Sequence, residues 1–241
     1  MKHIIRFFWA LGLIFGTCLG GSSFAATPAD HEKFWESNSS YKAMYDLYDL
    51  AQMNAYNLLD EKDMQALEKK SDAAIAESVK KSMAAGKGEA DAYAAAYGAQ
   101  VMYINKLVTL ALTDNKPLAG FYALSSDTLE GYLGITFDKD NDLYSLEFTV
   151  WDRADPGKTG RCYAQAGQMK EATVTSGVQE FTEASYTNNP GVQIKVAIKD
   201  GTATVATTDA FNKGKYVASG VGEDSVKSTL SIAGKYVLQE K

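Results

Sequence analysis

The strongest constraint on the fold is a single change of composition near Pro117, where helix-forming residues give way to residues typical of strands and turns. Residues 26–117 contain 18 alanines but only three glycines and three threonines, whereas residues 118–241 contain 13 of each. Alanine is the strongest helix former, while threonine favours strands and glycine favours turns. The sequence therefore predicts an α+β protein, with a helical region at 26–117 and an antiparallel β domain at 118–241.

About three amphipathic helices are expected in the first region. The first is predicted to begin at Ser39 or Ser40, because serine caps helix ends and large apolar residues then recur at helical spacing. Asp60 is predicted to cap the second helix, which should end before Gly86. The third is expected over about 89–112.

The β region shows the alternation of apolar and polar side chains that marks half-buried strands. The alternation is clearest over 192–199 and is followed by Asp200-Gly201, a pair that favours a two-residue hairpin turn. Further turns are predicted at 138–142, 155–157 and 188–191. Eight or nine short strands separated by such turns predict an antiparallel β-sandwich or barrel-like domain.

Residues 1–25 form a separate segment with the features of a bacterial secretory signal peptide. Two basic residues precede an apolar run that ends at Phe15, and small residues follow up to Ala25. This pattern predicts an exported, periplasmic or secreted protein cleaved after Ala25. Cys18 offers a lipoprotein anchor as an alternative, but the residues before it are not those usual in lipoprotein signals. No later segment is long and apolar enough to predict an integral membrane helix.

The predicted mature chain is acidic. The leader holds two of the 24 basic residues and none of the 30 acidic ones, so 22 basic residues against 30 acidic residues leave a formal charge of −8. This charge opposes binding to nucleic acid and to anionic membrane surfaces. Another protein or cell-wall material is therefore the expected partner, and the sequence leaves the oligomeric state open.

The residue types on which many enzymes depend are scarce. Of the two histidines, His3 lies in the leader, so His31 alone remains for a Ser-His-Asp triad or a histidine-rich metal site. Cys162 is the single cysteine after the leader, which excludes an internal disulfide and leaves a thiol that is either buried or reactive. We therefore expect a protein that is not an enzyme, without catalytic residues, metal or cofactor.

The acidic run 138–142 is the best candidate for a metal site, because alternate carboxylates on a tight loop can bind calcium. Leu143 stands where a calcium-binding loop of the helix-loop-helix type has its turn glycine, and Thr149 stands where it has its glutamate. The flanking residues indicate strands. We therefore interpret the run as a solvated hairpin tip and predict no metal.

Two short motifs together match a pattern of penicillin-binding enzymes. Ser78 and Lys81 have the S-x-x-K spacing, and Lys158-Thr159-Gly160 matches K-T-G. In those enzymes the serine opens a core helix, whereas Ser78 falls late in a charged helix. We interpret both matches as chance.

Tyrosines are concentrated in the helical region. At helical spacing beside methionines, such rings pack a small bundle more often than they line a groove for sugar or peptide. The core interpretation is therefore preferred. The residues concerned are Tyr41, Tyr45, Tyr48, Tyr56, Tyr93, Tyr97 and Tyr103.

Short patterns in the last half of the chain resemble the terminal β domain of bacterial periplasmic lysozyme-inhibitor-like proteins. The patterns are Trp151, Cys162, the hairpin through Asp200-Gly201, the run Ala218-Ser219-Gly220-Val221-Gly222, and Gly234-Lys235-Tyr236. The resemblance covers about residues 118–241. It implies a protein inhibitor whose exposed loop enters the lysozyme cleft. The partner-binding residues that it implies are Ser219, Gly220, Glu223 and Asp224.

Three classes of function follow from these observations. The leading prediction is an exported cell-envelope binding protein of the lysozyme-inhibitor-like kind. A structural or assembly factor that acts through the tyrosine-rich helices is the alternative, and a hydrolase that uses carboxylates alone is the third class. An exposed apolar helical face favours assembly, two carboxylates in one cleft favour an enzyme, and a protruding glycine-rich loop favours an inhibitor.

Overall fold

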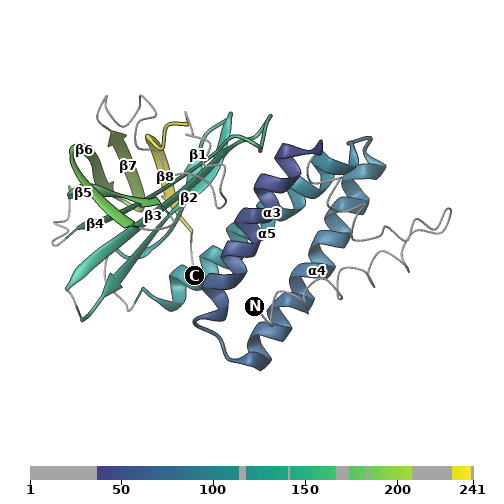
Figure 1. Cartoon of the computed structure of the whole chain (residues 1–241), viewed down its shortest axis with the longest axis horizontal. Coiled ribbons are helices and arrows are strands. Elements are labelled where there is room, and N and C mark those ends of the chain that lie inside the picture. Colours follow the sequence, from purple (N-terminus) through teal and green to yellow (C-terminus); the bar gives the residue numbers. More distant parts are fainter. Residues whose placement is uncertain are drawn as a thin grey trace.

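The computed structural model describes residues 37–113, 118–140, 142–166, 174–182, 185–207 and 230–239. Within these residues, three helices are followed by eight antiparallel strands (Figure 1), which confirms the predicted α+β class. The helices are α3 (Ser39–Tyr56), α4 (Glu61–Ala84) and α5 (Glu89–Ala111). The strands are β1 (Gly120–Ser125), β2 (Leu129–Asp138), β3 (Leu143–Asp152), β4 (Thr159–Ala166), β5 (Val174–Thr182), β6 (Ser185–Lys199), β7 (Thr202–Thr207) and β8 (Gly234–Leu238).

The helix boundaries follow local capping chemistry. Asp60 caps α4 as predicted, because its Oδ1 accepts a hydrogen bond from the Asp63 backbone N–H at 2.8 Å. The helix ends shortly before Gly86, whose φ of 87° is easily adopted by glycine. The predicted serine cap of α3 is wrong, since Asn38 occupies the cap position and makes no capping hydrogen bond through its side chain.

The eight strands form a closed barrel. Each strand pairs with the next one along the chain, and β8 pairs with β1. Of the two predicted architectures, a β-sandwich and a barrel, the structure has the barrel. Asp200 and Gly201 have φ values of 49° and 71°, which confirms the predicted hairpin turn between β6 and β7.

The turn predicted at 188–191 is wrong, because these residues lie within β6. The pairing with β5 shifts there: Gly177 pairs with Gln193, whereas the next residue, Val178, pairs with Asn189. The extra residues of β6 therefore form a bulge. A bulge accommodates a proline within a sheet because the ladder of backbone hydrogen bonds is already interrupted at that point.

Alternate side chains of the strands fill the barrel interior. Ile194, Val196 and Ile198 of β6 all point into it, as their spacing predicts. Cys162 on β4 is buried in the same core. Of the two states that the sequence left open for this thiol, buried or reactive, the structure shows the buried one. The other buried members of this core are Tyr122, Leu124, Leu133, Ile135, Leu146, Phe148, Val150, Ala203, Val205, Ile232 and Tyr236.

A second core joins the helices to the outer wall of the barrel. Phe121, Tyr132 and Trp151 project outward from β1, β2 and β3 and pack among the buried side chains of the helices. On α5, Gly98 allows close approach, since a Cβ at this position would lie 3.3 Å from Met44 Cε and 3.5 Å from Trp151. The helices therefore pack against one side of the barrel rather than forming a separate body (Figure 1).

Among the described residues, none of the helices combines the length and the apolar character needed to cross a bilayer.

Candidate functional site

The partner-binding residues implied by the resemblance lie outside the described residues. Ser219, Gly220, Glu223 and Asp224 fall between β7 and β8, in the range 208–229. The predicted leader, with Cys18, lies outside them as well. The geometry that bears on function therefore comes from the helices and from the barrel wall beneath them.

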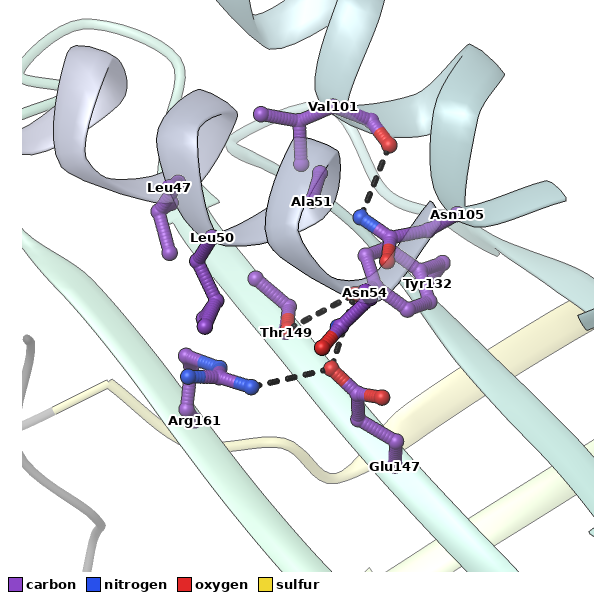
Figure 2. A pocket seen from close by; sticks show the side chains of 10 residues that line it. All are labelled: Leu47, Leu50, Ala51, Asn54, Val101, Asn105, Tyr132, Glu147, Thr149 and Arg161. Carbon is purple, nitrogen blue, oxygen red and sulfur yellow. Dashed lines mark hydrogen bonds and ion pairs between the residues drawn. The ribbon is translucent and has the colours of Figure 1, made fainter. Parts of the chain in front are cut away.

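A small pocket lies where the helices meet the barrel (Figure 2). Its empty space is about 160 Å³ including open solvent, and none of it has room for a water-sized molecule, so it is far smaller than the several hundred Å³ of a typical small-molecule site. Its lining residues are Leu47, Leu50, Ala51 and Asn54 of α3, Val101 and Asn105 of α5, and Tyr132, Glu147, Thr149 and Arg161 of the barrel.

Glu147 is the centre of the hydrogen bonds in this pocket. Its Oε1 accepts from the Tyr132 hydroxyl at 3.1 Å and from Arg161 Nη2 at 3.0 Å, as Figure 2 shows. Thr149 Oγ1 in turn donates to the Tyr132 hydroxyl at 3.2 Å. Burial, with a further effect of the Glu147 charge, raises the pKa of Tyr132 well above its ordinary value, so this hydroxyl keeps its proton and acts as a donor.

The chemistry of the pocket is structural. Glu147 is the one carboxylate among the lining residues, whereas hydrolysis by carboxylates needs two. Both groups that point at Glu147 are donors, and they neutralise and fix the carboxylate instead of leaving it available to substrate. The pocket therefore does not favour the hydrolase alternative.

Four carboxylates of α3 and α4 lie near Tyr45 and Tyr48, and we call them the acidic face: Asp46, Asp49, Glu68 and Asp72. Their charges affect the pKa values of these two tyrosines. After burial, which is the largest cause, the charge of Asp49 raises the pKa of Tyr45, and the charges of Asp72 and Glu68 raise the pKa of Tyr48. The helix α3 packs mainly on α5 and contacts α4 little. Packing between α3 and α4 therefore does not cover these carboxylates.

The carboxylates of the acidic face disturb one another. Partial loss of solvent raises the pKa of Asp49, Glu68 and Asp72, and the neighbouring charges of Asp46 and Asp72 add to the effect at Asp49 and Glu68 respectively. Asp46 has an ion pair with Lys42 at 2.6 Å. No ion pair is formed by Asp49, Glu68 or Asp72 with any described residue. The native state therefore holds negative charge here at some cost.

A buried hydrogen-bond acceptor lies beside this face. Gln52 is 5% exposed, and its Nε2 donates to the Tyr48 hydroxyl at 2.7 Å. The Ser71 hydroxyl of α4 is close enough to lower the pKa of Tyr48, which places the Gln52 amide at the junction of the two helices. Gln52 Oε1 has no hydrogen-bond partner within the described part of the chain. A buried carbonyl oxygen without a hydrogen-bond partner costs free energy in the native state.

Exposed apolar side chains continue the acidic face along α3. Asp46, Asp49, Met53 and Tyr56 are spaced three or four residues apart, so they form one stripe, which we call the α3 stripe. Met53 and Tyr56 are each 59% exposed. The exposed large apolar residues of the helical region, as far as it is described, are Met53, Tyr56, Leu58, Met83, Leu107 and Leu112.

The tyrosines of the helices mostly build the core, as predicted. Tyr41, Tyr48 and Tyr97 are buried, and the Tyr97 ring centroid lies 5.6 Å from that of Tyr41 and 5.2 Å from that of Tyr48. Tyr56 is the exception. It lies three residues after Met53 on the exposed face of α3, whereas its neighbour Ala55 lies on the buried face.

The described aspartates of the acidic run, Asp138, Asp140 and Asp142, lie at the tip of the β2–β3 hairpin, where the run was predicted. Asp138 Oδ1 accepts from the Asp140 backbone N–H at 2.9 Å, which stabilises the turn. Across the residues that the structure describes, no three metal-binding side chains come together.

The two penicillin-binding-like motifs lie on different elements. Ser78 is on α4, and Lys158 precedes β4 and pairs with Asp155 at 3.2 Å.

Comparisons of this chain with known protein families, with curated protein sequences and with solved structures found no significant match.

Proposed function

We propose that the chain is an exported cell-envelope binding protein that docks a partner protein on its helical region. The observation that carries this proposal is the α3 stripe, in which exposed Met53 and Tyr56 continue directly from Asp46 and Asp49. Exposed aromatic and methionine side chains beside charged groups are typical of protein-binding surfaces. Export is supported by the composition of residues 1–25.

The charge of the helical face supports a basic partner. A surface of one sign attracts a partner of the opposite sign and orients it during encounter. The chain as a whole is acidic as well. A basic lysozyme, the partner implied by the resemblance of residues 118–241, is one protein with this chemistry, and inhibition would then result from the bound complex.

Position-specific crosslinking tests the docking surface. A photo-reactive phenylalanine analogue replaces Tyr56 in the chain that begins at Ala26, and the protein is irradiated in an envelope extract. We expect one discrete crosslinked product, which excess unlabelled chain suppresses. A second chain carries the analogue at exposed Asp127 on the β1–β2 turn, and it should give no such product. Equal crosslinking from both positions would overturn the proposal.

Lysozyme is tested separately with the same preparation. We expect stoichiometric inhibition of a basic, chicken-type lysozyme that weakens at higher salt, because screening reduces attraction between exposed charges. Replacement of residues 219–224 distinguishes the two surfaces. If inhibition disappears with this replacement, the loop implied by the resemblance makes the contact. If it disappears instead with Met53→Ser, the helices do. Absence of inhibition at large molar excess would remove chicken-type lysozyme as the partner.

A further inference from the structure

We propose that α4 is a lid: in a minor fraction of the folded molecules it leaves α3 and α5 as one unit, while the other helices stay on the barrel. The place of α4 in the fold is the first support. It is the helix farthest from the barrel (Figure 1) and packs mainly on α5, whereas α5 also contacts β1 and β2. The ring of Trp151 on the barrel lies beside Gly98 of α5 and Met44 of α3. Departure of α4 therefore leaves this junction in place.

The seam between α3 and α4 contains buried polar atoms that no described residue satisfies. Ser71 is the middle one of the five buried residues of α4, and its hydroxyl has no hydrogen-bond partner among the described residues. Gln52 Oε1 of α3 is buried and unpartnered in the same way. Each of these atoms costs free energy while the seam is closed and regains water when α4 leaves. The seam therefore favours opening.

The two unpartnered atoms lie around one side chain, Tyr48 of α3. Gln52 Nε2 donates to the Tyr48 hydroxyl at 2.7 Å. Burial raises the pKa of Tyr48, and the nearby Ser71 hydroxyl opposes this effect, although it is not in the geometry of a hydrogen bond. Opening of α4 therefore uncovers Tyr48 and Gln52 together.

The attachments of α4 are weak for a helix of its length. Over its 24 residues it buries four apolar side chains, whereas α3 buries six over 18 residues, so less apolar burial holds each turn of α4. Its link to α5 from Lys70 Nζ to the Tyr103 hydroxyl, at 2.6 Å, is exposed, and water competes for it. The four buried apolar side chains are Met64, Leu67, Ile75 and Val79.

The connections at the ends of α4 leave room for the motion. A Cβ on Gly86 would meet no atom within 4 Å, and a Cβ on Gly88 would meet only Asp91 Oδ2, at 3.7 Å. Glycine changes its backbone angles at little steric cost, which suits a hinge. At the other end, Leu58 is 40% exposed. The helix can therefore turn away without disturbing packed side chains at its ends.

Hydrogen exchange measured by mass spectrometry tests the opening in the unmodified chain from Ala26. An isolated helix is marginal in water, so the amides of open α4 exchange. We expect peptides from 64–79 of α4 to exchange about tenfold or more faster than peptides from 92–105 of α5 and 129–138 of β2, after correction for intrinsic rates. The opening is a property of the chain alone, so the test requires no partner.

Two results of this experiment would overturn the proposal. One is exchange of α4 at the same rate as α5, which would show that α4 opens only when the whole helical region does. The other is fast exchange at one end of α4 with the amides around Ser71 as protected as those of α5, which would show fraying in place of a unit.

Thiol labelling with iodoacetamide provides a matched pair of variants. Val79→Cys places a thiol on the buried face of α4, and Val101→Cys places one on α5 at the boundary with the barrel. Buried Cys162 is the internal standard in each protein. We expect the thiol at 79 to react about tenfold or more faster than Cys162, and the thiol at 101 to react within about twofold of Cys162. Equal acceleration at both positions would contradict an opening confined to α4.

The contribution of the seam is tested by adding Ser71→Ala to the Val79→Cys protein. The change removes a buried hydroxyl that has no partner among the described residues, so we expect labelling at 79, relative to Cys162, to slow about fivefold. The control is Ser82→Ala, which alters a half-buried serine of the same helix and should change the ratio less than about twofold. An unchanged or increased ratio in the Ser71→Ala protein would overturn the assignment of this weakness to the seam.

Discussion

Tyr132 shows how much a single hydroxyl can contribute at the boundary between the helices and the barrel. It is buried in the shared core, donates to Glu147 and accepts from Thr149. We expect Tyr132→Phe to lower the free energy of unfolding by about 1–2 kcal/mol, because the variant leaves two polar groups short of a partner. Urea denaturation measures the change. The control is Tyr56→Phe, where the exposed hydroxyl makes no hydrogen bond to any described residue and the stability should be unchanged.

Gly131 on β2 is a position where only glycine fits. Its φ is 156°, and a Cβ added there would collide with the Thr149 carbonyl oxygen of β3 and lie 2.7 Å from Val150 Cα. We expect Gly131→Ala to destabilise the fold by about 3 kcal/mol, since backbone strain and a steric clash occur together. In the same denaturation assay, Gly88→Ala should cost less than about 1 kcal/mol, because space is available at that helix cap. Similar losses for both variants would contradict this account.

At the scale of elements, α3 and α4 carry a charge arrangement that does not favour stability. The pKa values of Asp49 and Asp72 are raised in the native state, so the native state keeps these protons to higher pH than the unfolded chain does. Protonation of these two carboxyl groups therefore stabilises the native state. This stabilisation is fully present below the pKa of the groups in the unfolded chain and is lost as the pH rises through their pKa in the folded protein.

The double variant Asp49→Asn, Asp72→Asn should therefore gain stability over the unmodified chain at about pH 7, and this gain should shrink at about pH 3. Chemical denaturation at the two pH values measures it. Glu77→Gln is the control with the opposite sign, because the ion pair with Lys81 lowers the pKa of Glu77. A double variant that is less stable than the unmodified chain at neutral pH would contradict the unfavourable charge arrangement.

At the scale of the whole molecule, the barrel and the helices depend on one shared core. Trp151 projects from β3 into the helical core. Its ring lies beside Gly98 of α5, next to the side chain of Met44. We expect Trp151→Ala to cost about 3–5 kcal/mol. We also expect helix loss, followed by circular dichroism, and exposure of the barrel core, followed by modification of Cys162, to occur at the same urea concentration. Separate transitions would show that the two regions unfold independently.

Local sequence features predicted the parts of this fold that local chemistry controls. The Asp60 cap, the Asp200-Gly201 hairpin and the inward face of 194–198 are found where predicted, because each depends on residues close together in the chain. Two local predictions are wrong. The cap position of α3 falls on Asn38 and not on a serine. Residues 188–191 form a bulge in place of a turn, because β6 pairs with β5 on both sides of them and this pairing overrides the local preference.

The sequence by itself determined the order of helices and strands, the acidity of the chain and the scarcity of catalytic residue types, since these follow from composition and spacing. Only the tertiary structure decided that the strands close into a barrel, that Tyr132 and Trp151 point away from its interior toward the helices, and that the acidic face lies beside Gln52. Asp49 and Asp72 are 23 positions apart in the sequence, yet both lie near enough to Tyr45 for their charges to raise its pKa. Such proximity depends on the geometry of packing between elements, which no local pattern of residues specifies.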